Sequence, residues 1–168
     1  MTGRHEGGSG AILVCEEGSS LVETALSSSI VLALIFGILQ MSLALYSYDC
    51  ICEAAREGSR YAMVRGSASC TNTSKLTNCN VSADQVQTYV KSLGFPGLNS
   101  AAYMQVLTIW LSASPAKPTT WVGCSPTVCN APGNLVQVQV TYQLPLSIPF
   151  WHSTVLSLGS TSQMVIAQ

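Results

Sequence analysis

The feature that most constrains this chain is a run of 25 consecutive residues without a charged side chain, Thr24 to Tyr48. A helix rises about 1.5 Å per residue, so about 20 apolar residues cross the hydrocarbon layer of a bilayer, which is about 30 Å thick. A secretory signal core has only about 7–15 apolar residues. A helix buried in a soluble protein is the alternative, but 26–45 contains nothing more polar than serine and Gln40. We therefore expect a membrane-spanning helix.

The helical pattern continues beyond the apolar run, because 48–65 contains no proline and only one glycine. Ala54, Gly58 and Ala62 are spaced four apart, which places three small side chains on one face. Such a stripe lets another element approach the helix closely. Two interpretations stay open, since the stripe could pack between subunits or rest on the chain's own C-terminal part. Gly66 and the Ser/Thr/Asn-rich segment after it mark the end of the helix.

The C-terminal part, 67–168, is poor in charge. Charged residues make up 9% of the whole chain, against about 25% in a typical soluble domain. Its charged residues are Lys75, Asp84, Lys91 and Lys117. A nucleic-acid-binding surface needs clustered basic residues, so we expect no nucleic-acid partner. A single acid provides no carboxylate pair, and His152 has no acid near it in sequence, so we predict no catalytic residue, no cofactor and no small-molecule substrate.

The cysteines of the C-terminal part form two short-range couples within Ser-, Thr-, Asn- and Pro-rich segments. The couples are Cys70 with Cys79, and Cys124 with Cys129. Loops of this composition are typically closed by disulfides in an oxidising compartment. Zinc or free thiols are the alternatives, but a zinc site favours C-x2-C knuckles or added histidines, so we expect no metal. Cys50 and Cys52 are two apart on a helix and point in different directions.

We expect an α+β fold, in which the long membrane helix continues into a small head domain with a short helix and an antiparallel sheet of about three strands. Ser82 and Gln85 can form a capping box at the start of a helix over 82–93. Strict alternation of Val and Gln predicts a half-buried strand over 135–142. Further strands are expected within 102–111 and 161–167. Prolines at 145 and 149 are expected to interrupt the chain between the last two strands.

Two arguments disagree on the orientation in the membrane. Only Arg4 precedes the span, whereas Arg56, Arg60 and Arg65 follow it, and the positive-inside rule would place the head in the cytoplasm. The cysteine couples and the uncharged composition favour an extracytoplasmic head. We follow the cysteines, because the three arginines alternate with acids and belong to the continuing helix.

Two sequences give a more specific indication. Gly-Ser-Ser-Leu-Val-Glu at 18–23, the apolar run, and Ala-Ala-Arg-Glu-Gly-Ser-Arg-Tyr-Ala at 54–62 resemble the TadE-like family, the pseudopilins of tight-adherence (Flp) pilus assembly systems. The resemblance implies that a prepilin-type peptidase cleaves between Gly18 and Ser19, which makes Glu23 the fifth mature residue. It also implies a leader peptide at 1–18, a pilin-like helix at 19–66 that includes the span 24–48, and an extracytoplasmic head at 67–168.

The resemblance further implies a minor pseudopilin of the inner membrane that meets other pilins and the pilus assembly machinery, and that can enter the pilus. Glu23 would pair with the α-amino group that cleavage exposes on a neighbouring subunit. The expected assembly residues are Glu23, Ala54, Gly58 and Ala62. One alternative is an uncleaved, single-pass binding or adhesion module, and another is a secreted hydrolase, which would need catalytic groups that the head lacks in sequence.

Overall fold

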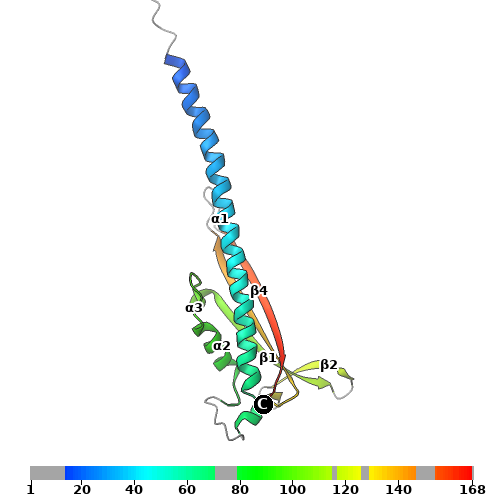
Figure 1. Cartoon of the computed structure of the whole chain (residues 1–168). Coiled ribbons are helices and arrows are strands. Elements are labelled where there is room, and N and C mark those ends of the chain that lie inside the picture. The colour runs from blue at the N-terminus through cyan, green and yellow to red at the C-terminus, as the bar shows by residue number, and fades with distance from the viewer. Residues whose placement is uncertain (1–13, 71–78, 115–116, 126–128, 147–153, 168) are drawn as a thin grey trace, which may run out of the picture.

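The fold is a long helix attached to a small α+β head (Figure 1). The computed structural model describes residues 14–70, 79–114, 117–125, 129–146 and 154–167. Its elements are α1 (Val14–Val64), η1 (Ser67–Cys70), α2 (Ala83–Ser92), α3 (Ser100–Tyr103), β1 (Met104–Ser114), β2 (Lys117–Cys124), β3 (Leu135–Leu146) and β4 (Thr154–Val165). The α+β class and the long N-terminal helix are confirmed.

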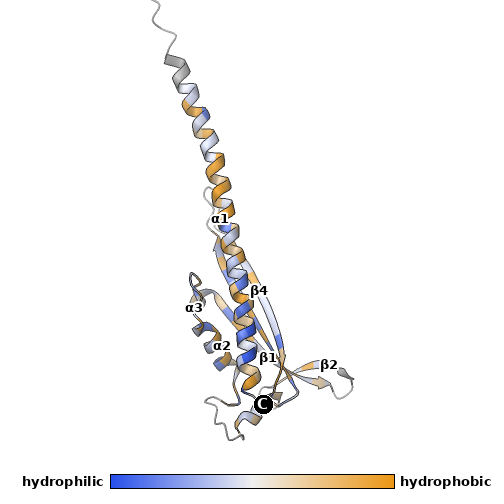
Figure 2. Ribbon diagram, in the orientation of Figure 1, coloured by the Kyte–Doolittle hydropathy of each residue, from blue (hydrophilic) through white to orange (hydrophobic). Residues whose placement is uncertain are grey.

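Helix α1 is a single element of 51 residues. Its middle part is the most apolar, and polar residues gather where it runs along the head, with a few more near its N-terminal end (Figure 2). It ends one residue before Arg65, and Gly66 then leads into η1. The predicted continuity between the apolar run and the following amphipathic segment is therefore correct.

The head contains one antiparallel sheet of four strands in the order β2-β1-β3-β4. The expectation of about three strands omitted β2, which holds Pro118 and Gly123 and lacks a regular alternation. Strand β3 also continues through Pro145, which pairs in register with Val155 of β4. Strand β3 therefore ends after the first of the two prolines that were expected to interrupt the chain. The second proline, Pro149, lies outside the described residues.

Helices α1 and α2 cover one face of the sheet. Val136, Val138 and Val140 of β3 are fully buried beneath them, while Gln137 and Gln139 alternate onto the opposite, partly exposed face. The predicted period of two therefore matches the alternation of buried and partly exposed residues along β3. The buried apolar core also takes in residues from both helices and β1: Ile51, Ala54, Ala55, Ala62, Val86, Val90, Met104 and Trp110.

Helix α2 begins at the predicted capping box. The Ser82 hydroxyl accepts a hydrogen bond from the backbone N–H of Gln85, and the Gln85 side chain accepts one from the backbone N–H of Ser82. Tyr89 of α2 stacks on Tyr61 of α1 with ring centroids 4.0 Å apart, and the Arg65 guanidinium lies 3.9 Å above the Tyr61 ring. The aromatic stack thus joins the two helices in addition to the core, and the cation–π contact lies at the C-terminal end of α1.

Two disulfides and one buried asparagine hold the end of the head that lies farthest along α1. The disulfides join Cys70 to Cys79 and Cys124 to Cys129, so both predicted couples are confirmed. Asn130 is 1% exposed, and the two hydrogens of its Nδ2 are shared among three oxygens: the carbonyls of Arg65 and Val81 and Asn80 Oδ1. These bonds connect the residue after α1 to the segment that precedes α2 and to the loop that precedes β3.

Candidate assembly surface

The first part of α1 extends away from the described part of the head and is exposed. Every residue from Gly18 to Leu39 is exposed, including large apolar side chains such as Leu21, Ile30 and Leu34, each more than 60% exposed. Among the described residues, Gly18–Val64 is the one helix that is long and apolar enough to span a membrane. An apolar surface of this extent is unfavourable in water, so this surface must be covered by lipid or by other helices.

The head begins to cover α1 at Gln40. Gln40 and Ala44 are partly buried, and Ser47 and Ile51 are buried. These four positions recur at the three- and four-residue spacing of one helix face. Tyr46 also contacts the head, because its hydroxyl donates to the Pro96 carbonyl at 3.0 Å. The expected span, 24–48, therefore overlaps the part of α1 that the head covers, and 18–39 is the part that no described segment of the head covers.

The residues expected at the cleavage site and at the charged assembly contact lie on the free part of α1. Gly18, Ser19 and Glu23 are all exposed. Within the described part of the chain, no basic group lies within ion-pair distance of the Glu23 carboxylate. Most of the expected leader, 1–13, lies outside the described residues. Glu23 is thus placed where a group from another chain could reach it.

The small-residue stripe lies inside the subunit. Ala54 and Ala62 have no exposed surface, and Gly58 is buried beneath α2 and β3. A Cβ atom added at Gly58 would lie 2.7 Å from Cγ2 of Val90 and 3.1 Å from Cγ1 of Val138. Of the two interpretations of the stripe, the structure shows close packing of the helix on its own head. Its three residues are therefore not accessible to a neighbouring subunit.

The charged residues after the span belong to the outer side of α1, as their alternation indicates. Arg60 forms an ion pair with Glu57 at 3.0 Å, and Arg56 forms one with Glu53 at 3.6 Å. Pairs of this kind contribute about 0–1 kcal/mol each to stability. Their main effect is to make this side of the helix hydrophilic.

Cys50 and Cys52 of α1 form no disulfide with the other cysteines whose side chains the structure describes. Cys50 is buried and Cys52 is half-buried. Their side chains belong to different faces of α1, as the two-residue spacing predicts. Cys50 lies one turn before Ala54 and contributes to the contact with the head.

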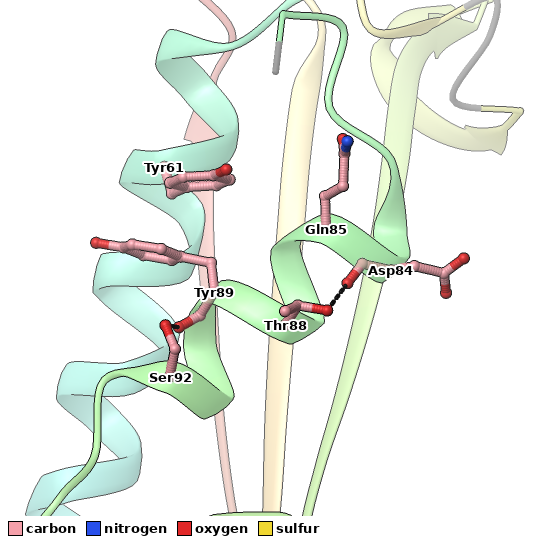
Figure 3. A pocket seen from close by; sticks show the side chains of 6 residues that line it. All are labelled: Tyr61, Asp84, Gln85, Thr88, Tyr89 and Ser92. Carbon is pink, nitrogen blue, oxygen red and sulfur yellow. Dashed lines mark hydrogen bonds between the residues drawn. The ribbon is translucent and has the colours of Figure 1, made fainter. Parts of the chain in front are cut away.

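A shallow hollow of about 300 Å³ lies between α1 and α2, lined by Tyr61, Asp84, Gln85, Thr88, Tyr89 and Ser92. Its polar groups do not converge, since Figure 3 shows the Asp84 carboxylate pointing away from the stacked tyrosines. The hydroxyls of Thr88 and Ser92 donate to carbonyls of α2 itself. Across the part of the chain that the structure describes, no group of three or more His, Cys, Asp or Glu side chains could hold a metal ion.

Sequence reasoning missed one contact between α1 and the sheet. The hydroxyl oxygens of Ser59 and Ser162 lie 2.8 Å apart, and Ser59 is fully buried. The only signal for Ser59 is its position beside Gly58 on the small-residue face. Nothing in the sequence distinguishes Ser162 from the other serines of β4.

Comparison with known proteins gives one match. Residues 18–60 match the family model described as TadE-like protein, which covers about a quarter of the chain and begins at the expected cleavage site. The suspected TadE-like resemblance is confirmed for this segment. No curated protein and no solved structure matches the chain.

Proposed function

We propose that this chain, whose segment 18–60 is TadE-like, is a minor pseudopilin that acts in the assembly of a tight-adherence (Flp) pilus. The observation that carries the proposal is the exposed apolar stretch of α1, 18–39, which is continuous with the part of the helix that packs on the head. A helix of this kind can be stored in a bilayer and later packed laterally against the helices of other subunits. The head then meets other pilins or the assembly machinery outside the bilayer.

The chemistry of the head supports an extracytoplasmic position. Two disulfides close its loops, and disulfides persist mainly in oxidising compartments. The basic residues that argue for the opposite orientation are engaged in the protein: Arg56 and Arg60 in ion pairs, and Arg65 over the Tyr61 ring. We therefore propose a single pass through the inner membrane with the C-terminal domain outside the cytoplasm.

Glu23 has a specific role in this proposal. Cleavage after Gly18 would expose the α-amino group of Ser19, which is a cation near neutral pH. A carboxylate within the bilayer is costly unless it meets a positive charge. Pairing Glu23 of one subunit with the amine of its neighbour removes the cost for both groups and sets the axial register between the helices.

The small-residue stripe is not part of the proposed intersubunit surface, because Ala54, Gly58 and Ala62 pack on the head. The exposed positions of 18–39 take that place. We propose an assembly role without catalysis, in which the partners are the membrane, a prepilin-type peptidase, other pilins or pseudopilins, and the assembly machinery.

The test is the N-terminal sequence of the protein purified from membranes of a host that expresses the matching peptidase. A host without the peptidase is the control, and its product should keep the residues before Ser19. The expected result is a start at Ser19 only when the peptidase is present.

An intact N-terminus, with the peptidase shown to process a known substrate in the same cells, would contradict the proposal. The protein would then be an uncleaved, membrane-anchored binding or adhesion module, and Glu23 would lose its proposed partner. A product that is soluble after cleavage would instead indicate a secreted protein.

A further inference from the structure

We propose that the head rests on the membrane through one end of its sheet, in addition to being anchored by α1. The contact surface is the last part of β3 and the first part of β4, here called the ladder end: Leu144, Pro145, Leu146, Val155 and Leu156. Its ligand is the interfacial layer of a phospholipid bilayer. The inference rests on the membrane anchor in the proposed function.

The direction of β4 relative to α1 follows from two contacts. The Ser59 and Ser162 hydroxyl oxygens lie 2.8 Å apart, and the backbone N–H of Ala167 donates to the Met63 carbonyl at 3.2 Å. Both elements therefore advance together away from the N-terminus of α1. The start of β4 and the end of β3 consequently lie toward the free, apolar part of the helix, as Figure 1 shows.

The height of the ladder end along α1 can be worked out from these contacts. Val155 precedes Ser162 by seven residues, which is about 23 Å of strand at about 3.3 Å per residue. The same distance along α1 corresponds to about 15 residues at about 1.5 Å each. Counting back from Ser59, Val155 lies at about the height of Ala44, where the helix first meets the head.

The bilayer boundary falls at the same height. If the crossing begins at Thr24, directly after Glu23, about 20 residues carry the chain across the hydrocarbon layer. That crossing ends near Leu43. Tyr46 and Tyr48, which are half-exposed, follow within a turn and a half, and tyrosine is enriched at this boundary of membrane helices. The ladder end is therefore level with the lipid headgroups.

The surface of the ladder end suits this environment. Val155 is 63% exposed and Leu156 is 37% exposed, and Pro145, which pairs with Val155, is also exposed. Strands β3 and β4 contain no charged residue along their whole length. This apolar surface lies at the same height along α1 as the exposed side chains of Leu43 and Leu45. Contact with lipid at this end would fix the tilt of the head relative to the bilayer.

The test is photo-crosslinking from p-benzoylphenylalanine placed at Val155 of the full chain in phospholipid membranes, with phospholipid adducts measured by mass spectrometry. Val165 is the matched control, because it lies on the same strand and sheet face, is the same residue type and is 52% exposed. Leu39, on the free part of α1, reports whether the helix is in the bilayer. We expect a severalfold higher lipid-adduct yield at 155 than at 165, and a high yield at 39.

The outcomes separate this inference from the proposed function. Lipid adducts at 39, with equal low yields at 155 and 165, would overturn the lipid contact and leave the anchor intact. No lipid adducts at 39 would overturn the anchor itself. Adducts at 155 to another protein would show that the ladder end binds a protein partner instead. A second probe at Pro145, opposite Val155 in the ladder, should repeat the result if the first variant misfolds.

Discussion

The hydroxyl group of Ser162 on β4 donates a hydrogen bond to the hydroxyl oxygen of Ser59 on α1, at an oxygen–oxygen distance of 2.8 Å. The donor is assigned by elimination, since Ser59 has one hydroxyl hydrogen and gives it to the Arg56 carbonyl at 2.9 Å. The contact lies toward the C-terminal end of the interface between the helix and the sheet, four residues before Met63, whose carbonyl accepts from the backbone N–H of Ala167. Together the two contacts align β4 along α1.

We predict that Ser59→Ala and Ser162→Ala each lower the free energy of unfolding by about 0.5–1.5 kcal/mol, because each removes the hydrogen bond between the two hydroxyl groups. The double variant should cost less than the sum of the two, since both partners are then gone. The measurement is urea unfolding of the full chain in detergent, followed by circular dichroism. Strict additivity would show that the hydroxyls do not interact.

Gly58→Ala is predicted to destabilise the protein by about 1–3 kcal/mol, which is the usual cost of an overpacked core. The added Cβ would lie 2.7 Å from Cγ2 of Val90 and 3.1 Å from Cγ1 of Val138. Neither neighbour is at the end of a flexible side chain, so the strain cannot relax locally. The thermal midpoint of the full chain measures the effect.

Two variants make the Gly58 prediction specific. In Gly58→Ala/Val90→Ala the space is restored, so the double variant should be more stable than the sum of the single effects predicts. Gly37→Ala is the helical control, because nothing lies within 4 Å of its added Cβ. If Gly58→Ala were as stable as Gly37→Ala, the close contact of α1 with the sheet would be wrong.

Asn130→Ala is predicted to cost about 1–3 kcal/mol, because it leaves buried carbonyls without their donor. Its Nδ2 group bonds the carbonyls of Arg65 and Val81 at 3.4 and 3.3 Å. Gln163→Ala is the control, since the Gln163 amide is exposed, donates to the side chain of Gln137 on the open face of the sheet and should change stability by less than about 0.5 kcal/mol. Equal stabilities of the two variants would contradict the structural role of Asn130.

Sequence patterns correctly predicted the helices and strands whose capping residues or hydrophobic periodicity match the way they are buried in the fold. The capping box at Ser82 fixes the start of α2, and the alternation in 135–142 survives because one face of β3 is buried by helices. Strand β2 gave no such signal, because it pairs with β1 at Lys117 and at 121–124, with a register shift opposite Ala113 and Ser114 of β1. Pro145 is accepted in β3 because proline can occupy a strand position where its missing N–H is not needed.

The assembly surface was predicted less completely. An apolar run identifies a membrane helix, but a stripe of small residues is the same sequence pattern whether it faces a neighbour or its own domain. Gly58 faces its own sheet because Val90 and Val138 are there to meet it, and those residues lie far from it in sequence. The start of the head at Gln40 likewise depends on long-range contacts, which periodicity does not encode.

Removal of the Cys124–Cys129 disulfide is predicted to cost about 2 kcal/mol, the chain-entropy value for a loop closed over so few residues. It holds the end of β2 beside the segment that leads to Asn130, so β2 should become the first strand to lose protection. The measurement is hydrogen exchange of Cys124→Ser/Cys129→Ser, with Cys70→Ser/Cys79→Ser as the matched pair. Equal loss of protection at β2 in both variants would contradict the local role of this disulfide.

Glu23→Leu is predicted to leave the protein in the membrane and to weaken its co-assembly with other pilins by about tenfold or more. Leucine removes the cost of placing a carboxylate near the bilayer, so insertion is retained. The neighbour's α-amino group then has no counter-charge, and each 1.4 kcal/mol lost is a tenfold change in affinity. Membrane fractionation measures the first effect, and crosslinked pilin complexes measure the second.

The charge itself, rather than the side-chain volume, is tested by Glu23→Gln, which should impair co-assembly nearly as much as Glu23→Leu. Glu53→Gln is the matched control, because Glu53 lies on the same helix, is exposed, and pairs with Arg56 of the same helix at 3.6 Å. Its loss should leave co-assembly unchanged, since an exposed pair contributes about 0–1 kcal/mol. Normal pilus assembly by both Glu23 variants would show that the register between subunits is set by the apolar side chains of 18–39 and not by an ion pair.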